Sequence, residues 1–205
     1  MNRRLAIALL ILVSLTLPSF ARGRKTVSKE PGTYKEWGPD IDEIEIVKTF
    51  STNDYEKIVV TPFNTASTPL PDEKEDSYKA IKAVLDDFTP EFTTALQKEL
   101  KASAKVEEAK KAPKKGKVLV LRAKVESIDP GSRAARYWAG FGAGAAGTKI
   151  SGEIADAATG AVLIRFTQAR RSGGTWKFAG GNDTTVMKDS IHALAQDVAH
   201  LLDTF

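Results

Sequence analysis

The clearest pattern in the chain is an apolar stripe that recurs every three or four residues between positions 77 and 102. Such spacing places the apolar side chains on one face of an α-helix. Pro90 interrupts the stretch and follows Thr89, so the chain either kinks here or begins a second helix. Because the stripe stays in phase across the proline, we expect one kinked helix. Its apolar positions are Ile81, Leu85, Phe88, Phe92, Leu96 and Leu100.

Strand patterns occupy much of the remaining chain. A β-branched run that ends before Pro62 predicts a short buried strand. Alternating apolar and polar residues later in the chain predict half-buried strands, two of which are joined by a hairpin loop that ends at Gly160. The predicted strands span residues 57–61, 117–128, 149–156, 161–168 and, at a sheet edge, 175–179.

A second helical stripe follows the glycine pair at 180–181, where Asn182 or Asp183 is expected to cap the helix. Its apolar side consists of Met187, Ile191, Leu194, Ala195, Val198, Leu201 and Leu202. Two long amphipathic helices and hairpin-linked strands predict the α+β class. The expected architecture is a two-layer sandwich, a mostly antiparallel sheet with both helices packed on one face.

The first 21 residues match all three regions of a secretory signal peptide. Arg3 and Arg4 provide the charged start, an apolar run follows at 5–17, and Ala21 places a small residue at the cleavage position. The apolar run is shorter than the ~20 residues that cross a bilayer core. We therefore expect cleavage after Ala21 and export to the periplasm or the cell envelope. The chain has no cysteine, which excludes disulfides and a lipid-modified N-terminal cysteine, so we expect no lipoprotein.

We divide the chain into a signal peptide at 1–21, a loosely ordered segment at 22–54 and a single α+β domain at 55–205. Proline, glycine and acidic residues punctuate the middle segment. Removing the two arginines of the signal leaves 28 of the 30 basic residues against 26 acidic ones. The mature chain is therefore nearly neutral, and its net charge indicates no particular partner.

Seven lysines gather between positions 101 and 117. They form either a patch for anionic lipid, polysaccharide or nucleic acid, or a solvated hairpin loop that keeps a sheet edge soluble. The second interpretation is favoured, because no aromatic residues interleave with the lysines for stacking on bases. We accordingly expect no nucleic-acid partner. The lysines are Lys101, Lys105, Lys110, Lys111, Lys114, Lys115 and Lys117.

Glycine and alanine dominate a segment that is preceded by arginines and aromatic rings and followed by a predicted strand. Three roles remain open for this interaction segment. Its backbone passes close against the sheet or a neighbouring chain, or it inserts shallowly into a membrane or contacts a partner, or its amides and arginines hold a small anion. The expected interaction residues are Arg133, Arg136, Tyr137, Trp138, Gly140, Phe141, Gly142, Gly144 and Gly147.

No pattern in the chain indicates catalysis. The glycines from Gly142 to Gly147 match the dinucleotide fingerprint only in form, because a strand rather than a helix is predicted after them. The two histidines lie eight residues apart, which is not a metal-ligand spacing on a helix. We therefore expect no enzyme, no cofactor and no metal site. The ionisable residues expected on the surface of the last helix are His192, His200, Asp189, Asp197 and Asp203.

Three stretches stand out together, the runs 129–136 and 140–144 and the strand that ends in 156–160. In these stretches the chain resembles the bacterial exported-protein family known as domain of unknown function 4410. The resemblance covers residue 57 to the C-terminus and is most specific between 118 and 166. Members are typically exported and often lipoproteins, from which this chain departs by lacking the cysteine. The family has no established activity, so the resemblance implies a protein class rather than a function.

These observations predict a non-enzymatic periplasmic or envelope-associated protein whose Gly/Ala-rich segment contacts a membrane or a protein partner. The alternative is a soluble periplasmic module that binds a small anionic ligand. The expected partners are an envelope protein or a membrane surface, and no oligomeric state is indicated.

Overall fold

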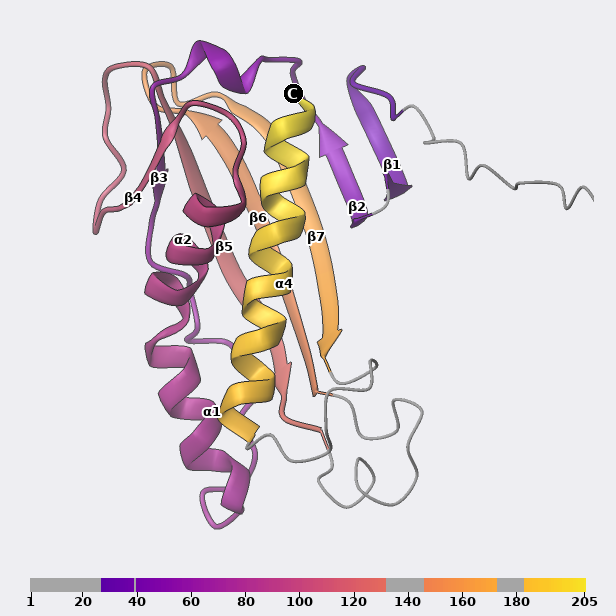
Figure 1. The fold of residues 1–205 in the computed structure, drawn as a ribbon, viewed down its shortest axis with the longest axis vertical. Coiled ribbons are helices and arrows are strands. Elements are labelled where there is room, and N and C mark those ends of the chain that lie inside the picture. The colour runs from indigo at the N-terminus through magenta and orange to yellow at the C-terminus, as the bar shows by residue number, and fades with distance from the viewer. Residues whose placement is uncertain (1–26, 39, 132–145, 173–182) are drawn as a thin grey trace, which may run out of the picture.

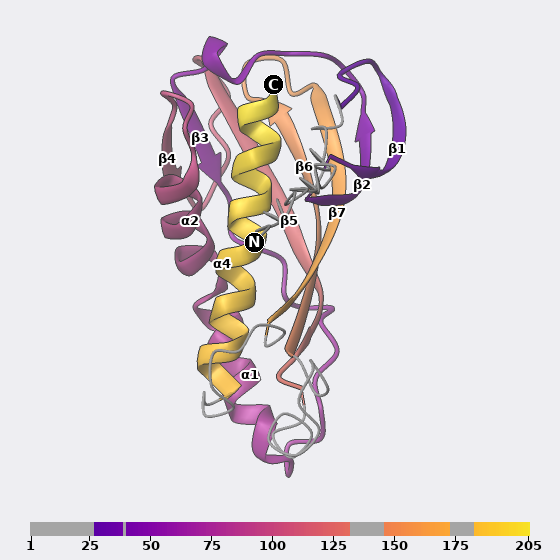
Figure 2. The same cartoon turned by 45° about the vertical axis from the view of Figure 1, so that its right-hand side comes forward.

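The computed structural model describes residues 27–38, 40–131, 146–172 and 183–205. These residues form a seven-stranded sheet in the order β1-β2-β7-β6-β5-β3-β4, with three α-helices on one side of it (Figures 1 and 2). The strands are β1 (Gly32–Trp37), β2 (Ile41–Ile46), β3 (Lys57–Val60), β4 (Lys105–Glu108), β5 (Val118–Asp129), β6 (Ala146–Asp156) and β7 (Val162–Ser172). The helices are α1 (Asp76–Asp86), α2 (Phe88–Glu99) and α4 (Asp183–Thr204), and Thr52–Asp54 form the short 3-10 helix η1.

The sheet is mixed, so the prediction of a mostly antiparallel sheet with two long helices on one face is wrong. Strand β3 pairs in parallel with both β4 and β5, while the other neighbours are antiparallel. Parallel pairing requires crossovers. The chain passes from β3 to β4 through α1 and α2, and from β4 to β5 through residues 109–117. Neither β4 nor this second crossover was predicted, and both change the direction in which neighbouring strands run.

The predicted helix over 77–102 is divided into α1 and α2 by one residue, Asp87. Asp87 keeps a nearly helical backbone, with φ −91° and ψ 0°, so the apolar stripe continues in phase from one helix to the next. Pro90, in the first turn of α2, has no N–H to donate to a carbonyl one turn earlier. All six predicted stripe residues are buried, with at most 9% of their surface exposed, which confirms the helical pattern.

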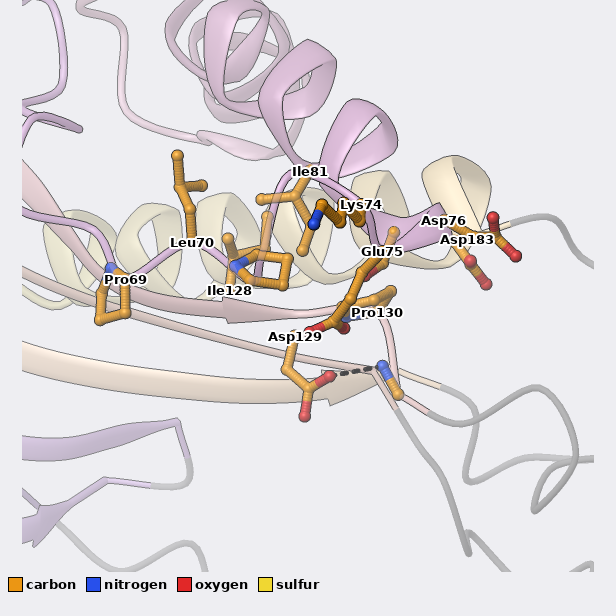
Figure 3. A pocket seen from close by; sticks show the side chains of 13 residues that line it. Pro69, Leu70, Lys74, Glu75, Asp76, Ile81, Ile128, Asp129, Pro130 and Asp183 are labelled. Carbon is orange, nitrogen blue, oxygen red and sulfur yellow. Dashed lines mark hydrogen bonds between the residues drawn. The ribbon is translucent and has the colours of Figure 1, made fainter.

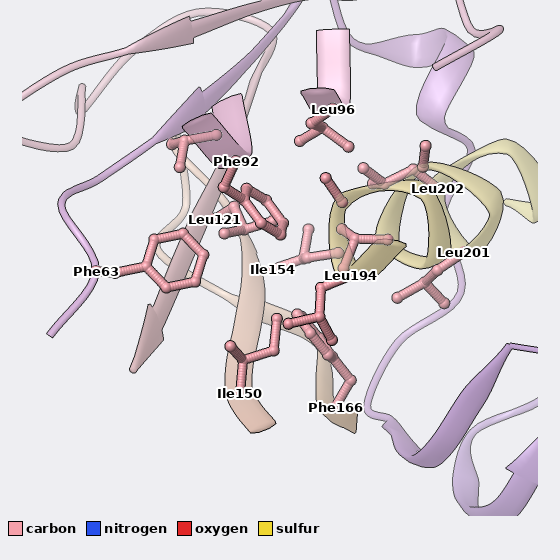
Figure 4. Packing of buried hydrophobic residues seen from close by; sticks show 14 of the residues in the cluster. Phe63, Phe92, Leu96, Leu121, Ile150, Ile154, Phe166, Leu194, Leu201 and Leu202 are labelled. Atoms are coloured by element: carbon pink, nitrogen blue, oxygen red, sulfur yellow. The ribbon is translucent and has the colours of Figure 1, made fainter. Parts of the chain in front are cut away.

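The main core lies between the helices and the sheet (Figure 4). Phe63, just after β3, packs against Phe88 and Phe92 of α2 with ring centroids 4.8 and 4.9 Å apart. All seven apolar positions predicted for the last helix are at most 1% exposed, which confirms that side of α4. Gly152 of β6 leaves room in this core for the ring of Phe166 on β7, because an added Cβ would lie only 2.9 Å from its Cζ.

The opposite face of the sheet is mainly polar. Charged residues pair across neighbouring strands, with Arg122 2.9 Å from Glu153 and Arg165 2.8 Å from Glu45. At the β3 end this face carries a small apolar cluster, on which Ala109 and Ala112 pack. The buried members of the cluster are Val59, Val118, Val120 and Ala157. The crossover at 109–117 therefore covers the one part of this face that the structure describes as a buried apolar cluster.

The segment 22–54, predicted to be loosely ordered, contributes β1 and β2 to the sheet. These strands pair with each other, and β2 pairs in addition with β7. The ring of Phe205 stacks on Trp37 of β1 at 5.7 Å and on Phe50 at 4.9 Å, measured between ring centroids. The first strands and the last residue are thus packed together.

Candidate functional site

Most of the predicted interaction segment lies outside the described residues, because Arg133 to Gly144 fall within 132–145. Gly147 is described and lies in β6, where it pairs with Asp129 of β5 and Arg171 of β7. A methyl group at this position would lie 3.7 Å from the nearest side-chain atom, an ordinary contact. Close packing therefore does not require glycine at position 147. The position is a strand residue, whereas the dinucleotide fingerprint needs a helix here.

The topology gathers two connections at one end of the sheet, which we call the loop end (Figure 1). Strand β5 ends at Asp129 and β7 ends at Ser172, while β6 begins at Ala146 and α4 begins at Asp183. The pairs Asp129 with Gly147 and Ala146 with Ser172 hold the three strand ends side by side. The connections that leave this end contain, in sequence, the aromatic residues Tyr137, Trp138, Phe141, Trp176 and Phe178.

A pocket of about 770 Å³ opens at the loop end, between the chain before α1 and the end of β5 (Figure 3). Ile81 of α1 and Ile128 of β5 contribute buried side chains to it. Leu70 is 45% exposed, an unusual exposure for a large apolar residue in this structure. The lining residues are Pro69, Leu70, Pro71, Lys74, Glu75, Asp76, Ser77, Ile81, Ile128, Asp129, Pro130, Gly131 and Asp183.

Backbone hydrogen bonds to β5 fix one wall of the pocket. Asn64 donates its N–H to the Ala123 carbonyl at 2.9 Å, and its own carbonyl accepts the N–H of Val125 at 3.0 Å. Thr68, which is buried, donates its hydroxyl to the Val125 carbonyl at 2.8 Å. The chain from 64 to 68 therefore runs along β5 and positions the exposed Leu70 beside the pocket. On the opposite wall, Asp129 accepts the N–H of Gly131 at 2.8 Å.

The charges around the pocket favour a cationic or apolar group over an anion. Its described lining contains four carboxylates and one ammonium group, that of Lys74. The same lining contains three prolines and three aliphatic side chains. The described residues contain no cluster of three side chains able to hold a metal ion. This arrangement suits contact with an apolar or basic surface, and the described part of it contains no nucleophile paired with a base.

A second polar assembly joins the β1–β2 turn to α4, and we call it the polar network. Arg170 of β7 donates from Nε and Nη2 to both carboxylate oxygens of Asp197 on α4. Gln168 donates to the same carboxylate at 2.7 Å. Arg170 also contacts Asp40 at 3.1 Å, and Asp40 lies 2.9 Å from Nδ1 of His200. These contacts join β7, α4 and the turn between β1 and β2, so the polar network acts as a structural tie.

Burial and ion pairing act in opposite directions within the polar network. Burial raises the pKa of Asp197, and the contacts with Arg170 and Gln168 oppose this increase. The hydrogen bonds to Asp197 raise the pKa of Arg170, so the arginine is held in its charged form. The ion pair with Arg170 thus offsets part of the cost of removing the Asp197 carboxylate from water.

The structure corrects the sequence-based view of the ionisable residues on α4. Asp197 was expected to be solvated, yet its side chain is only 2% exposed. Asp203 accepts the backbone N–H groups of Lys101 and Ala102 at the end of the α2 region, at 3.0 and 2.9 Å. His192 agrees with the expected surface position, because it is 53% exposed beside Glu91. The sequence could not identify the partner of Asp197, since Arg170 lies on another element.

None of the helices in the described parts of the chain has the length and apolar character of a membrane-spanning segment. Comparison with protein families gives a match for this chain: a family model described as "Domain of unknown function (DUF4410)" matches residues 46–174. No curated protein matches the chain.

Among solved structures, the PelC dodecamer from Paraburkholderia phytofirmans is 16% identical, with a TM-score of 0.43. The match covers 75% of this chain and 96% of that chain. A Xanthomonas campestris protein described with the family model DUF330 is 12% identical, with a TM-score of 0.41. That match covers 72% of this chain and 84% of the other. Both are distant likenesses.

Proposed function

This chain belongs to the family of domain of unknown function 4410, and from that premise we propose a non-enzymatic protein of the periplasm or cell envelope that contacts a membrane or protein partner through its loop end. The proposal includes export by the N-terminal signal, with cleavage after Ala21. The contact would be made by the Gly/Ala-rich interaction segment together with the neighbouring connection at 173–182.

The observation that carries this proposal is the convergence of two connections rich in glycine and aromatic residues at the loop end. Aromatic residues are enriched at protein interfaces and at membrane surfaces because their rings bury a large area. The adjoining pocket adds the exposed Leu70 and three prolines to the same end. Among the described residues, the loop end therefore offers the exposed Leu70 near the end of β5, the strand that precedes the interaction segment.

The alternative function, binding of a small anion, receives less support from the described pocket. Four carboxylates line it against a single lysine, so an anionic ligand would meet net repulsion there. The chemistry of the described residues at the loop end thus favours a macromolecular contact over anion capture.

Cell fractionation with variants tests the contact. After a high-salt wash, which screens the ionic contacts of exposed lysines, Trp138→Ala should release the protein from the membrane fraction or from its partner while leaving the melting temperature unchanged, because an interfacial ring contributes to binding rather than to folding. Trp37→Ala is a matched control, since Trp37 is 6% exposed and stacks on Phe205. It should lower the melting temperature. Unchanged association of the Trp138→Ala variant would refute the proposed contact.

Export is tested separately by sequencing the N-terminus of the protein recovered from cell fractions. The proposal requires a mature chain that begins at Arg22 and is found outside the cytosol. An intact Met1 on cytosolic protein would contradict it.

A further inference from the structure

The crossover at 109–117, which we call the lysine loop, carries five lysines and no acidic residue. All five side chains are exposed. None of them forms an ion pair or a side-chain hydrogen bond with another described residue, which contrasts with the nearby Lys57, paired with Glu107 at 3.1 Å. The five are Lys110, Lys111, Lys114, Lys115 and Lys117.

The lysine loop is held in a defined position on the sheet. Ala109 donates its N–H to the carbonyl of Val60 at one end of β3, at 3.1 Å. At the other end of β3, the carbonyl of Lys117 accepts the N–H of Glu56 at 2.9 Å. Ala112 packs on the apolar cluster between these anchors. Because β3 has four residues, which span about 13 Å, the five lysines are confined to a small area.

The structure also changes the interpretation of these lysines as a hairpin loop at a sheet edge. The strands on either side, β4 and β5, both run parallel to β3, so the loop crosses over β3 instead of turning back as a hairpin. Of the seven clustered lysines, Lys105 lies in the edge strand β4 itself and can protect that edge. The lysine loop instead concentrates its charge over the face of the sheet at β3.

We propose that the lysine loop docks the protein on a surface of anionic phospholipid headgroups. The five confined lysines outnumber the bordering carboxylates of Glu56 and Glu108, so the loop attracts such a surface, and each lysine contributes about 1 kcal/mol, a factor of about five in binding. A nucleic acid is a poorer fit. The loop has no aromatic residue on which the bases of a nucleic acid could stack.

This surface is distinct from the loop end. The lysine loop leads into the first residue of β5, and the loop end follows the last residue of the same strand. Twelve strand residues span roughly 36 Å, and Figure 1 shows the two regions at opposite ends of the sheet. A protein held on lipid by the lysine loop would therefore keep its loop end available for a protein partner. The lipid docking does not rest on the proposed function of the loop end.

Sedimentation with lipid vesicles tests the docking. Protein purified as the cells process it should bind vesicles of mixed phosphatidylglycerol and phosphatidylcholine, and should not bind vesicles of phosphatidylcholine alone. Combining Lys110→Glu, Lys111→Glu, Lys114→Glu and Lys115→Glu should weaken binding to the anionic vesicles at least about 600-fold, from about fivefold per lysine. Binding of the unaltered chain should also fall with salt, as the Debye length shortens from ~10 Å at 0.1 M to ~3 Å at 1 M.

A matched control separates the position of the charges from the net charge. Lys35, Lys48, Lys79 and Lys82 are exposed and lie outside the lysine loop, and changing all four to glutamate alters the net charge equally. This control should retain vesicle binding, and both variants should keep the melting temperature of the unaltered chain. Equal loss in both variants would overturn the proposal, as would binding of the unaltered chain to soluble dextran sulfate but not to anionic vesicles. Trp138→Ala should leave vesicle binding by the lysine loop intact, which keeps this test separate from that of the loop end.

Discussion

Gly152 offers a direct test of how the core is packed against β6. A Cβ added at this position would lie 2.9 Å from Cζ of Phe166 and 3.0 Å from the backbone oxygen of Arg122. Phe166 is 3% exposed and belongs to the main core, so its ring has little space into which to move. The backbone oxygen of Arg122 is held in the β5–β6 ladder. Gly152→Ala should therefore overpack the core.

The magnitude follows from two opposing effects. Overpacking costs typically about 1–3 kcal/mol, while replacing glycine by alanine stabilises by about 0.4–1 kcal/mol through the unfolded chain. Gly147→Ala, in the same strand, should show only the second effect, because its nearest new contact is an ordinary 3.7 Å. The free energies of unfolding of the two variants should thus differ by about 1–3 kcal/mol, with Gly152→Ala the less stable.

Urea unfolding measures this difference as a shift of the midpoint at constant slope. Adding Phe166→Leu to Gly152→Ala should recover part of the loss, because the smaller side chain removes the closest contact but not the contact with Arg122. Equal midpoints for Gly152→Ala and Gly147→Ala would refute the packing described for β6 and β7.

Three further predictions concern buried and ionisable residues. Leu96→Ala should cost about 2–5 kcal/mol of unfolding free energy, because Leu96 is fully buried. His192→Ala should change the unfolding free energy by no more than about 0.5 kcal/mol. Chemical denaturation of the two variants compares these values. Arg170→Met leaves Asp197 buried without its ion pair, so the pKa of Asp197 should rise further. The unfolding free energy of this variant should then increase as the pH falls through the raised pKa. Melting temperatures measured across acidic pH test this increase, and a flat profile would contradict it. Burial raises the pKa of Tyr55 to about 12. The contribution of the neutral Tyr55 to the unfolding free energy is therefore complete below pH ~10 and should be lost as the pH rises toward 12. The Tyr55→Phe variant should lose less unfolding free energy over this range, as measured by alkaline unfolding.

The parts of the fold that the sequence predicted are those in which burial follows a local period. The stripe over 81–100 and the apolar side of α4 give strong helical patterns, and their residues are buried. Strands β3, β5, β6 and β7 match the predicted runs to within a few residues. In the helices and in most of the strand residues one face meets the core, so the alternation of apolar and polar residues records the packing. Strand β3 is buried on both faces, and its β-branched run gave the signal instead.

The missed features have no such local signal. Strand β1 lies at a sheet edge and buries only Trp37, and β4 is a four-residue strand in which only Val106 is buried. The direction of β4 and β5 relative to β3 depends on the path of the crossovers, which hydrophobic periodicity does not encode. The buried Asp197 depends on Arg170 and Asp40, which lie far away in sequence and give no local pattern. The residues proposed for the interaction segment were found from composition, and of these Gly147 alone has a described position.

The pairing of β2 with β7 has a consequence for the order in which the chain folds. Glu45 of β2 lies 120 residues before its partner Arg165, and chains emerge N-terminus first during synthesis. An isolated two-stranded hairpin is only marginally stable in water, so β1 and β2 have no lasting partner until β7 appears, and their ring stack waits for Phe205. Hairpin docking is thus expected to be a late kinetic step, during which exposed strand edges are open to proteases and to pairing with other unfinished chains.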